Sequence, residues 1–325
     1  MTEFYTRPDT HAFLTFLNAL PGPKMHELSP PEARQAMRAM RDVADAPVGE
    51  LALIRDLTID GPAGTIPARL YDARESRAPG PVMVFFHGGG WVIGDLETHA
   101  PFCAEAARLL DLPVIAIDYR LAPEHPWPAA PEDCEAAARW VAESPAALGR
   151  GVTGLILAGD SAGGNLTITT AMALRDSPAQ APVIAQFPIY PATDFSKPYE
   201  SYEKFAEGRL LTHEAMEWFA ANYAADVDHV RASPLLGDVA GLPPALVLTA
   251  GLDPIRDQGR AYAAALIAAG IPVIFREARG NIHGFINLAR GIPSSTGDIA
   301  GALRALKDLV TEAEAGRVLG QAAAE

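Results

Sequence analysis

Cysteine is nearly absent from this sequence of 325 residues. The only two, Cys103 and Cys134, form no C-x-x-C pair and have no metal-ligand spacing, which argues against a disulfide framework and against a zinc site. We expect both thiols to behave as small hydrophobic side chains, buried or half-buried in the core.

Long apolar runs and an excess of basic residues are also missing. No uninterrupted apolar segment approaches the roughly 20 residues that a membrane helix needs. The first residues carry no basic stretch followed by an apolar one, so no signal peptide is expected. The formal net charge is −14, and such a charge repels nucleic acids and anionic membranes. We expect a soluble, cytoplasmic protein without a nucleic-acid partner and without membrane insertion.

The remaining composition is that of a globular α/β protein, with 49% hydrophobic and 20% charged residues. From Pro81 onward, apolar strands alternate with Ala-rich helical segments, which predicts a mostly parallel central sheet with helices on both faces. A hairpin is expected before them, with strands at 51–59 and 66–71 around turn residues. The later strands are expected at residues 82–86, 114–117, 155–158, 183–187, 245–249 and 273–275.

Two segments break this alternation. Residues 1–48 have a mixed helical pattern, and residues 191–243 are aromatic-rich and helical after Thr212. An insertion of that length between two core strands is expected to fold as a lid or cap, and a longer crossover connection is the alternative.

The hexapeptide from Gly159 to Gly164, GDSAGG, directly follows an apolar run and precedes residues with helical spacing. It fits the nucleophile elbow G-x-S-x-G, in which a strand turns tightly into a helix. That turn has no room for side chains at Gly159 and Gly163, and it lifts the oxygen of Ser161 toward the positive end of the helix. The short motif also occurs by chance at ordinary helix starts, so the rest of the chain has to decide.

A glycine-rich loop, His87-Gly88-Gly89-Gly90-Trp91, follows the first strand of the alternating region. Its unshielded N–H groups predict an oxyanion hole, with Gly89 and Gly90 as donors beside the N–H of Ala162. We expect His87 to order the loop through its ring nitrogens. A phosphate-binding loop is disfavoured, because no Lys-Ser/Thr follows and no G-x-G-x-x-G opens a helix.

A nucleophilic serine needs a base, and the base needs a carboxylate that orients it. Of eight histidines, His283 alone follows the last strand of the sheet. Asp253 stands at the exit of the preceding strand, where ligands gather in open α/β sheets, and the order Ser161, Asp253, His283 is that of the α/β-hydrolases. Asp257 is the rival carboxylate, which we interpret as a residue that favours a helix start.

These motifs occur in one order from Val82 to Phe285: HGGGW, DYRLAPEHP, GDSAGG, DPIRD and HGF. Together they resemble the hormone-sensitive-lipase family of microbial carboxylesterases. The resemblance implies an α/β-hydrolase with a helical cap, divided into N-terminal cap helices (1–48), a first catalytic part (49–190), a cap insertion (191–243) and a second catalytic part (244–325).

The resemblance also implies roles for single residues. Ser161 would be the nucleophile, Asp253 and His283 its partners, and Gly88, Gly89 and Gly90 with Ala162 the oxyanion hole. Arg120 and Glu124, in a segment that is mainly structural in the family, would form an internal ion pair. Gln258, where the family often has Glu, and the loop Gly280-Asn281 depart from the usual pattern.

The implied activity is hydrolysis of short- to medium-chain carboxylic esters through an acyl-enzyme, with no metal or cofactor. A homodimer is an expectation from the same resemblance. The substrate pocket is expected between sheet and cap, lined by Trp91, Phe205, Leu210, Leu211 and Phe285.

Two other functions are weighed against this one. A small-molecule receptor without turnover would be expected to have lost a triad member, and His283 is present. Amide or peptide hydrolysis could use the same triad, but the proline-rich peptidases of this fold usually carry a propeller domain for which the chain has no room.

Overall fold

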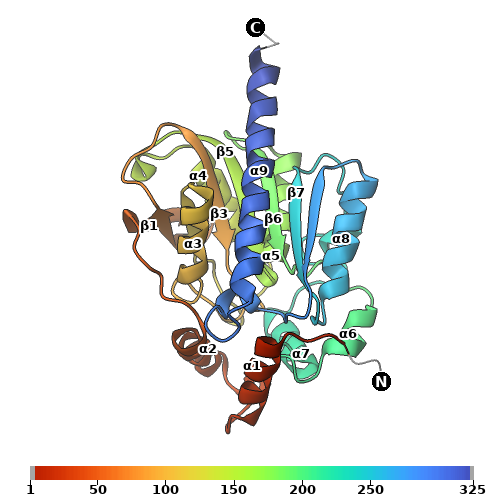
Figure 1. The fold of residues 1–325 in the computed structure, drawn as a ribbon. Helices are drawn as coiled ribbons and strands as arrows, with labels where there is room; N and C mark the ends of the chain where they lie inside the picture. Colours follow the sequence, from red (N-terminus) through yellow and green to blue (C-terminus); the bar gives the residue numbers. More distant parts are fainter. Residues whose placement is uncertain (1–3, 323–325) are drawn as a thin grey trace.

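The computed structural model describes residues 4–322. Residues 1–3 of the first expected segment and residues 323–325 of the last one lie outside the described part. Its centre is an eight-stranded sheet in the order β1-β2-β4-β3-β5-β6-β7-β8, with β1 to β4 joined through antiparallel pairs at β2 and every pair from β4 to β8 parallel (Figure 1). The strands are β1 (Leu53–Gly61), β2 (Gly64–Asp72), β3 (Gly80–Phe86), β4 (Val114–Ile117), β5 (Val152–Asp160), β6 (Val183–Ile189), β7 (Ala245–Ala250) and β8 (Val273–Ala278).

Helices cover both faces of this sheet, as the alternation of strands and helices predicts. Strand residues alternate between two buried layers, so Val84 and Phe86 face one layer while Met83 and Phe85 face the other. The first layer is completed by α4 (Ala129–Ala142), α5 (Ala162–Asp176) and α8 (Arg256–Ala268), and the second by α3 (Ala100–Leu110) and α9 (Ser295–Ala322). Cys103 and Cys134 are free and buried, one in each layer, as expected.

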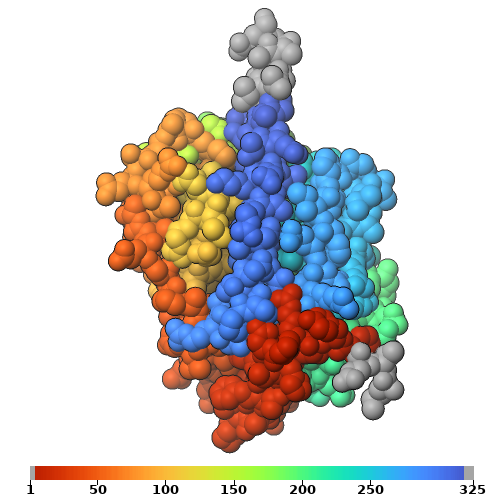
Figure 2. Space-filling model, in the orientation of Figure 1, coloured from red at the N-terminus to blue at the C-terminus, as the bar shows by residue number. Residues whose placement is uncertain are grey.

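The two segments outside the alternation lie together beyond the carboxyl ends of the strands (Figure 1). They contain α1 (Pro8–Ala19), α2 (Pro30–Ala44), α6 (Glu200–Phe205) and α7 (His213–Tyr223). The side chain of Asn18 donates to the carbonyl of Gly208 (3.1 Å), and the rings of Phe4 and Phe205 meet edge to face at 4.9 Å. Figure 2 shows the N-terminal residues forming one end of the molecule, while α9 runs along the face above them.

Local sequence explains where these helices begin. Ser29 and Glu32 form a reciprocal capping box at the start of α2, and the prolines that follow lack an N–H that would need an acceptor there. The hydroxyl of Thr212 accepts the N–H of Ala215 at the start of α7. The start of α7 agrees with the helical segment expected after Thr212.

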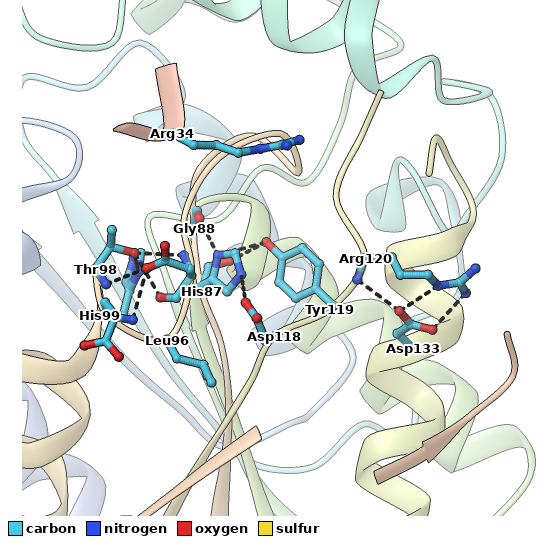
Figure 3. Close-up of polar contacts among 12 residues, drawn as sticks. Arg34, His87, Gly88, Leu96, Thr98, His99, Asp118, Tyr119, Arg120 and Asp133 are labelled. Atoms are coloured by element: carbon cyan, nitrogen blue, oxygen red, sulfur yellow. Dashed lines mark hydrogen bonds and ion pairs between the residues drawn. The ribbon is translucent and has the colours of Figure 1, made fainter. Parts of the chain in front are cut away.

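The expected ion pair between Arg120 and Glu124 is wrong. Arg120 binds Asp133 on α4, with Nη2 and Oδ1 2.8 Å apart (Figure 3). Glu124 instead receives the guanidinium of Arg34 from α2 (2.6 Å). Asp133 is fully buried, and a buried carboxylate needs such a partner. Both partners are remote in sequence, so the spacing within the segment gives no indication of them.

Within the described residues, no helix is both long enough and apolar enough to cross a bilayer.

Candidate active site

Ser161 occupies the turn between β5 and α5 with φ 56° and ψ −116°, a conformation that residues other than glycine rarely adopt. Such backbone strain costs on the order of 1–3 kcal/mol and persists only where the surrounding fold imposes it. A Cβ on Gly163 would overlap the carbonyl oxygen of Phe86, and one on Gly159 would overlap the backbone of Gly163. The turn is therefore as tight as the elbow motif predicts.

A hydrogen-bonded chain runs from this serine to a buried carboxylate. Ser161 Oγ is 2.8 Å from His283 Nε2, and His283 Nδ1 is 2.7 Å from Asp253 Oδ2. Because a carboxylate only accepts, the Nδ1–H of His283 donates to Asp253, which leaves Nε2 free to accept from the serine hydroxyl. The second oxygen of Asp253 accepts the N–H of Ile255 (2.8 Å), so the carboxylate is fixed from both sides.

The two loops that carry this pair are joined directly. The N–H of Gly251 donates to Ala278 O (3.0 Å), and the N–H of Leu252 donates to Asn281 O (2.9 Å). Asn281, one of the departures from the family pattern, is fully buried here. The exits of β7 and β8 are thus held at one spacing, which sets the distance between Asp253 and His283.

Asp257, the rival carboxylate, points elsewhere. Its Oδ2 accepts the N–H of Ser201 at the start of α6 (3.0 Å), and its Oδ1 accepts from Arg256 (2.8 Å). It lies in the first turn of α8, as its interpretation as a helix-start residue predicts. It anchors the insertion to the sheet domain and does not contact His283.

The glycine loop presents free donors beside the serine. The Gly88 N–H donates to Asp160 Oδ1 (2.7 Å) and is therefore unavailable to an oxyanion, which corrects the expectation for that residue. For the N–H groups of Gly89 and Gly90, no acceptor is found among residues 4–322. Ala162 opens α5, where N–H groups lack intrahelical acceptors. Three donors thus remain of the four expected.

His87 holds the loop and is kept neutral. Burial, followed by the nearby charge of His99, lowers its pKa to about 4. Its Nδ1–H donates to the Gly88 carbonyl (2.8 Å), while its own carbonyl accepts from the hydroxyl of Tyr119 (2.7 Å) (Figure 3). A neutral, fully enclosed imidazole orders the loop, as the sequence predicts.

Of the five expected pocket residues, three are buried in the core and two are half-buried. Phe205 and Phe285 have no exposed surface, and Trp91 is buried with its ring stacked on Tyr223 at 4.2 Å, so these three pack into the core. Leu211 is half-buried. Leu210 lies 3.4 Å from the position of a Cβ on Gly284, next to His283.

One side chain against the site was not singled out from sequence. The ring of Phe219 on α7 occupies the position that a Cβ on Gly90 would need. Its signal was present only as one aromatic among many in residues 191–243. A helical segment of that composition does not reveal which ring turns toward the sheet.

An elbow serine, a histidine–carboxylate pair and free backbone donors on a parallel sheet define a serine hydrolase of α/β-hydrolase fold. The family model described as "alpha/beta hydrolase fold" matches residues 83–287. Among similar proteins, the "Carboxylic ester hydrolase LipN" of Mycobacterium tuberculosis is 42% identical over 286 residues, covering 84% of this chain and 75% of that protein. The "Ethyl acetate hydrolase" of Pseudomonas putida is 36% identical over 314 residues, covering 92% and 98%.

Solved structures of esterases have the same fold as this chain. A thermostable esterase from Pseudomonas putida superposes with a TM-score of 0.89 at 32% identity, covering 95% of this chain and 99% of that one. An ester-hydrolase from the metagenome of Lake Arreo, complexed with a bipyridine phosphonate derivative, gives 0.89 at 38%, covering 93% and 98%. The chain belongs to the hormone-sensitive-lipase family of α/β-hydrolases.

Proposed function

We propose that this protein is a serine carboxylesterase that hydrolyses short- to medium-chain carboxylic esters through an acyl-enzyme intermediate. The observation that carries the proposal is the continuous chain of short contacts from Ser161 Oγ through His283 to Asp253 (2.8 and 2.7 Å). The esterases among the family members described above support the choice of esters over amides.

In this proposal, Ser161 attacks the ester carbonyl while His283 Nε2 takes the hydroxyl proton. The carbonyl oxygen becomes an oxyanion that accepts from the N–H groups of Gly89, Gly90 and Ala162. The resulting imidazolium is stabilised by Asp253 and then protonates the leaving alcohol, so the tetrahedral intermediate collapses to an acyl-serine. A water molecule repeats the attack with His283 as base, which releases the acid and restores the serine. The chemistry requires no metal or cofactor.

We further propose that residues 1–48 and 191–243 form a cap over the catalytic parts at 49–190 and 244–325. The contact of Phe219 with Gly90 and that of Leu210 with Gly284 support this division, because they bring the insertion against two loops of the site. Selection of the acyl chain would then depend on the cap, and bond cleavage on the loops beneath it.

A chain-length series tests the proposal. Initial rates on p-nitrophenyl esters from acetate to palmitate should be highest for the shorter chains, and Ser161→Ala should abolish them. Ser177→Ala is the matched control, because Ser177 is exposed at the opposite end of the same helix. An inactive wild-type protein, or full activity in Ser161→Ala, would contradict the proposal.

A further inference from the structure

A second buried histidine–carboxylate pair lies next to the triad and contacts the glycine loop. Asp160, the residue before the nucleophile, is 3% exposed, and His99 is 1% exposed. His99 Nε2 lies 3.2 Å from Asp160 Oδ1, the same oxygen that accepts the Gly88 N–H at 2.7 Å. Tyr190 links the two pairs, because its hydroxyl donates to Asp160 (3.3 Å) and its ring packs on His283 with centroids 4.6 Å apart.

The hydrogen bonds around His99 make Nε2 the donor toward Asp160. Nε2 faces the carboxylate of Asp160, which only accepts. Nδ1 lies 3.0 Å from Thr98 Oγ1, whose own proton goes to the carbonyl of Asp95 (2.9 Å) (Figure 3). The same hydroxyl oxygen accepts the N–H of Asp95 (2.9 Å), so Thr98 is fixed in the loop beside His99. The Nε2–H of His99 is thereby held against the carboxylate of Asp160.

The pair explains how an ionised carboxylate is tolerated at this depth. Burial alone would raise the pKa of Asp160, but the charge and hydrogen bond of His99, together with the Gly88 N–H, lower that pKa below its ordinary value. Without His99, a bare negative charge would lie directly behind the loop that has to stabilise an oxyanion. The hydrogen bond from His99 stabilises that charge and keeps the acceptor for Gly88 in place.

We propose that His99 and Asp160 are positioning residues of the oxyanion hole: Asp160 ties the elbow to the glycine loop through Gly88, and His99 holds Asp160 in place and stabilises its charge. The inference rests on the proposed esterase function and deepens it. Because Gly88 is fixed in this way, Gly89 and Gly90 keep their N–H groups directed at the position beside Ser161 where the oxyanion forms. Neither His99 nor Asp160 is expected to touch the substrate.

The test compares two kinds of substitution at each position. His99→Ala removes the partner of Asp160, whereas His99→Gln supplies an amide donor in its place. Asp160→Ala removes the acceptor of the Gly88 N–H, whereas Asp160→Asn keeps an oxygen for it. Loss of one oxyanion donor lowers kcat about 10²–10³-fold, so we expect both alanine variants to lose kcat on that order with KM nearly unchanged. Both conservative variants should recover most of the loss.

A tetrahedral inhibitor separates positioning from general stability. A trifluoromethyl ketone forms an oxyanion on the serine, so its inhibition constant should weaken in the alanine variants by the same factor as kcat/KM. Tyr262→Phe is the control, because its buried hydroxyl bonds Gln186 (2.6 Å) far from the loop and its loss should lower only the melting temperature. If His99→Ala destabilises the protein but keeps wild-type kcat and inhibitor binding, the role is merely structural and the inference fails.

The experiment also separates this inference from the proposed function. A wild-type protein without esterase activity overturns both. An active wild type whose His99 and Asp160 variants all keep wild-type kcat overturns only the positioning role. Should the alanine variants fail to fold, His99→Gln and Asp160→Asn still decide. If the inference holds, their kcat and inhibitor affinity must fall together, by less than the roughly 10²–10³-fold loss of a missing donor.

Discussion

The loops at the carboxyl ends of the strands, which we call the floor, differ sharply from the helices above them, residues 4–48 and 191–243, which we call the cap. The floor is built from buried groups whose neighbours leave no freedom: Gly163 has no room for a side chain, and Asp253 is held through both oxygens. The cap exposes large apolar side chains, such as Phe16 at 53% and Val43 at 62%. This difference fits the proposal made above, in which the floor carries out the reaction and the cap selects the substrates.

The largest expected effect distinguishes two acidic residues at the edge of the floor. Asp253→Asn should lower kcat by about 10⁴, because an amide in that position favours the wrong tautomer of His283. Asp257→Asn should leave kcat close to wild type, since Asp257 contacts Ser201 and Arg256 and not His283. Steady-state kinetics on one short-chain ester measures both. Equal losses in the two variants would contradict the assignment of Asp253.

The next effect lies where floor and cap touch. Gly90→Ala should lower kcat on the order of 10²-fold, because the new methyl group overlaps the ring of Phe219 and pushes the loop away from the oxyanion position. Adding Phe219→Ala should restore much of that loss. Gly149→Ala is the control: Gly149 also has positive φ, at 67°, but nothing lies near its Cβ position. If the double variant Gly90→Ala/Phe219→Ala is as slow as Gly90→Ala, contact with the ring of Phe219 is not the cause of the loss.

A smaller effect concerns selection by the cap alone. Phe219→Ala should raise kcat/KM for longer acyl chains relative to acetate by roughly tenfold, since each methylene accommodated in an apolar pocket is worth about 1–3 kcal/mol. The same chain-length series should be unchanged in Phe16→Ala, because Phe16 is a cap residue on α1 with half of its surface exposed. An unchanged profile in Phe219→Ala would place the acyl pocket elsewhere.

The smallest effect concerns the attachment of the cap to the floor. Arg34 donates to the carbonyls of Val92 (2.8 Å) and Ala122 (2.9 Å) and to Glu124. Arg34→Ala should lower the free energy of unfolding by about 1–2 kcal/mol at neutral pH. Arg38, also on α2, pairs only with Asp95, and its side chain is 61% exposed. Arg38→Ala should therefore lower the free energy of unfolding by less than Arg34→Ala does. A larger cost for Arg38→Ala in urea unfolding would contradict this ranking.

The contribution of the Arg34–Glu124 pair to the free energy of unfolding depends on pH. The hydrogen bond from Arg34 lowers the pKa of Glu124 to about 2 from a reference value of 4.5. A carboxyl with a depressed pKa stabilises the folded state above its unfolded pKa, and that stabilisation is lost as pH falls from about 4.5 to about 2. Because the side chain of Glu124 is 49% exposed, water screens the pair and the change should be small. The difference in the free energy of unfolding between wild type and Arg34→Ala should therefore become smaller as pH falls over that range.

The same contrast explains what the sequence could predict. The elbow, the glycine loop and the strand exits that carry Asp253 and His283 are local patterns, so short motifs were sufficient to find them. The partner of Glu124 and the contact of Phe219 depend on how remote segments dock, and no spacing along the chain encodes that. Asp160 lies at the variable position of G-x-S-x-G, and only the fold brings it to His99. The homodimer stays a prediction, which light scattering would test.

In the mechanism proposed here, Ser161 carries the acyl group during turnover. The most direct test is to quench the enzyme with acid during steady-state hydrolysis of p-nitrophenyl acetate and to locate the acetyl group by peptide mass spectrometry. We expect a single acetylated peptide that contains Ser161, and no acetylated peptide in Ser161→Ala. Rapid turnover with the acetyl group on another residue would contradict it.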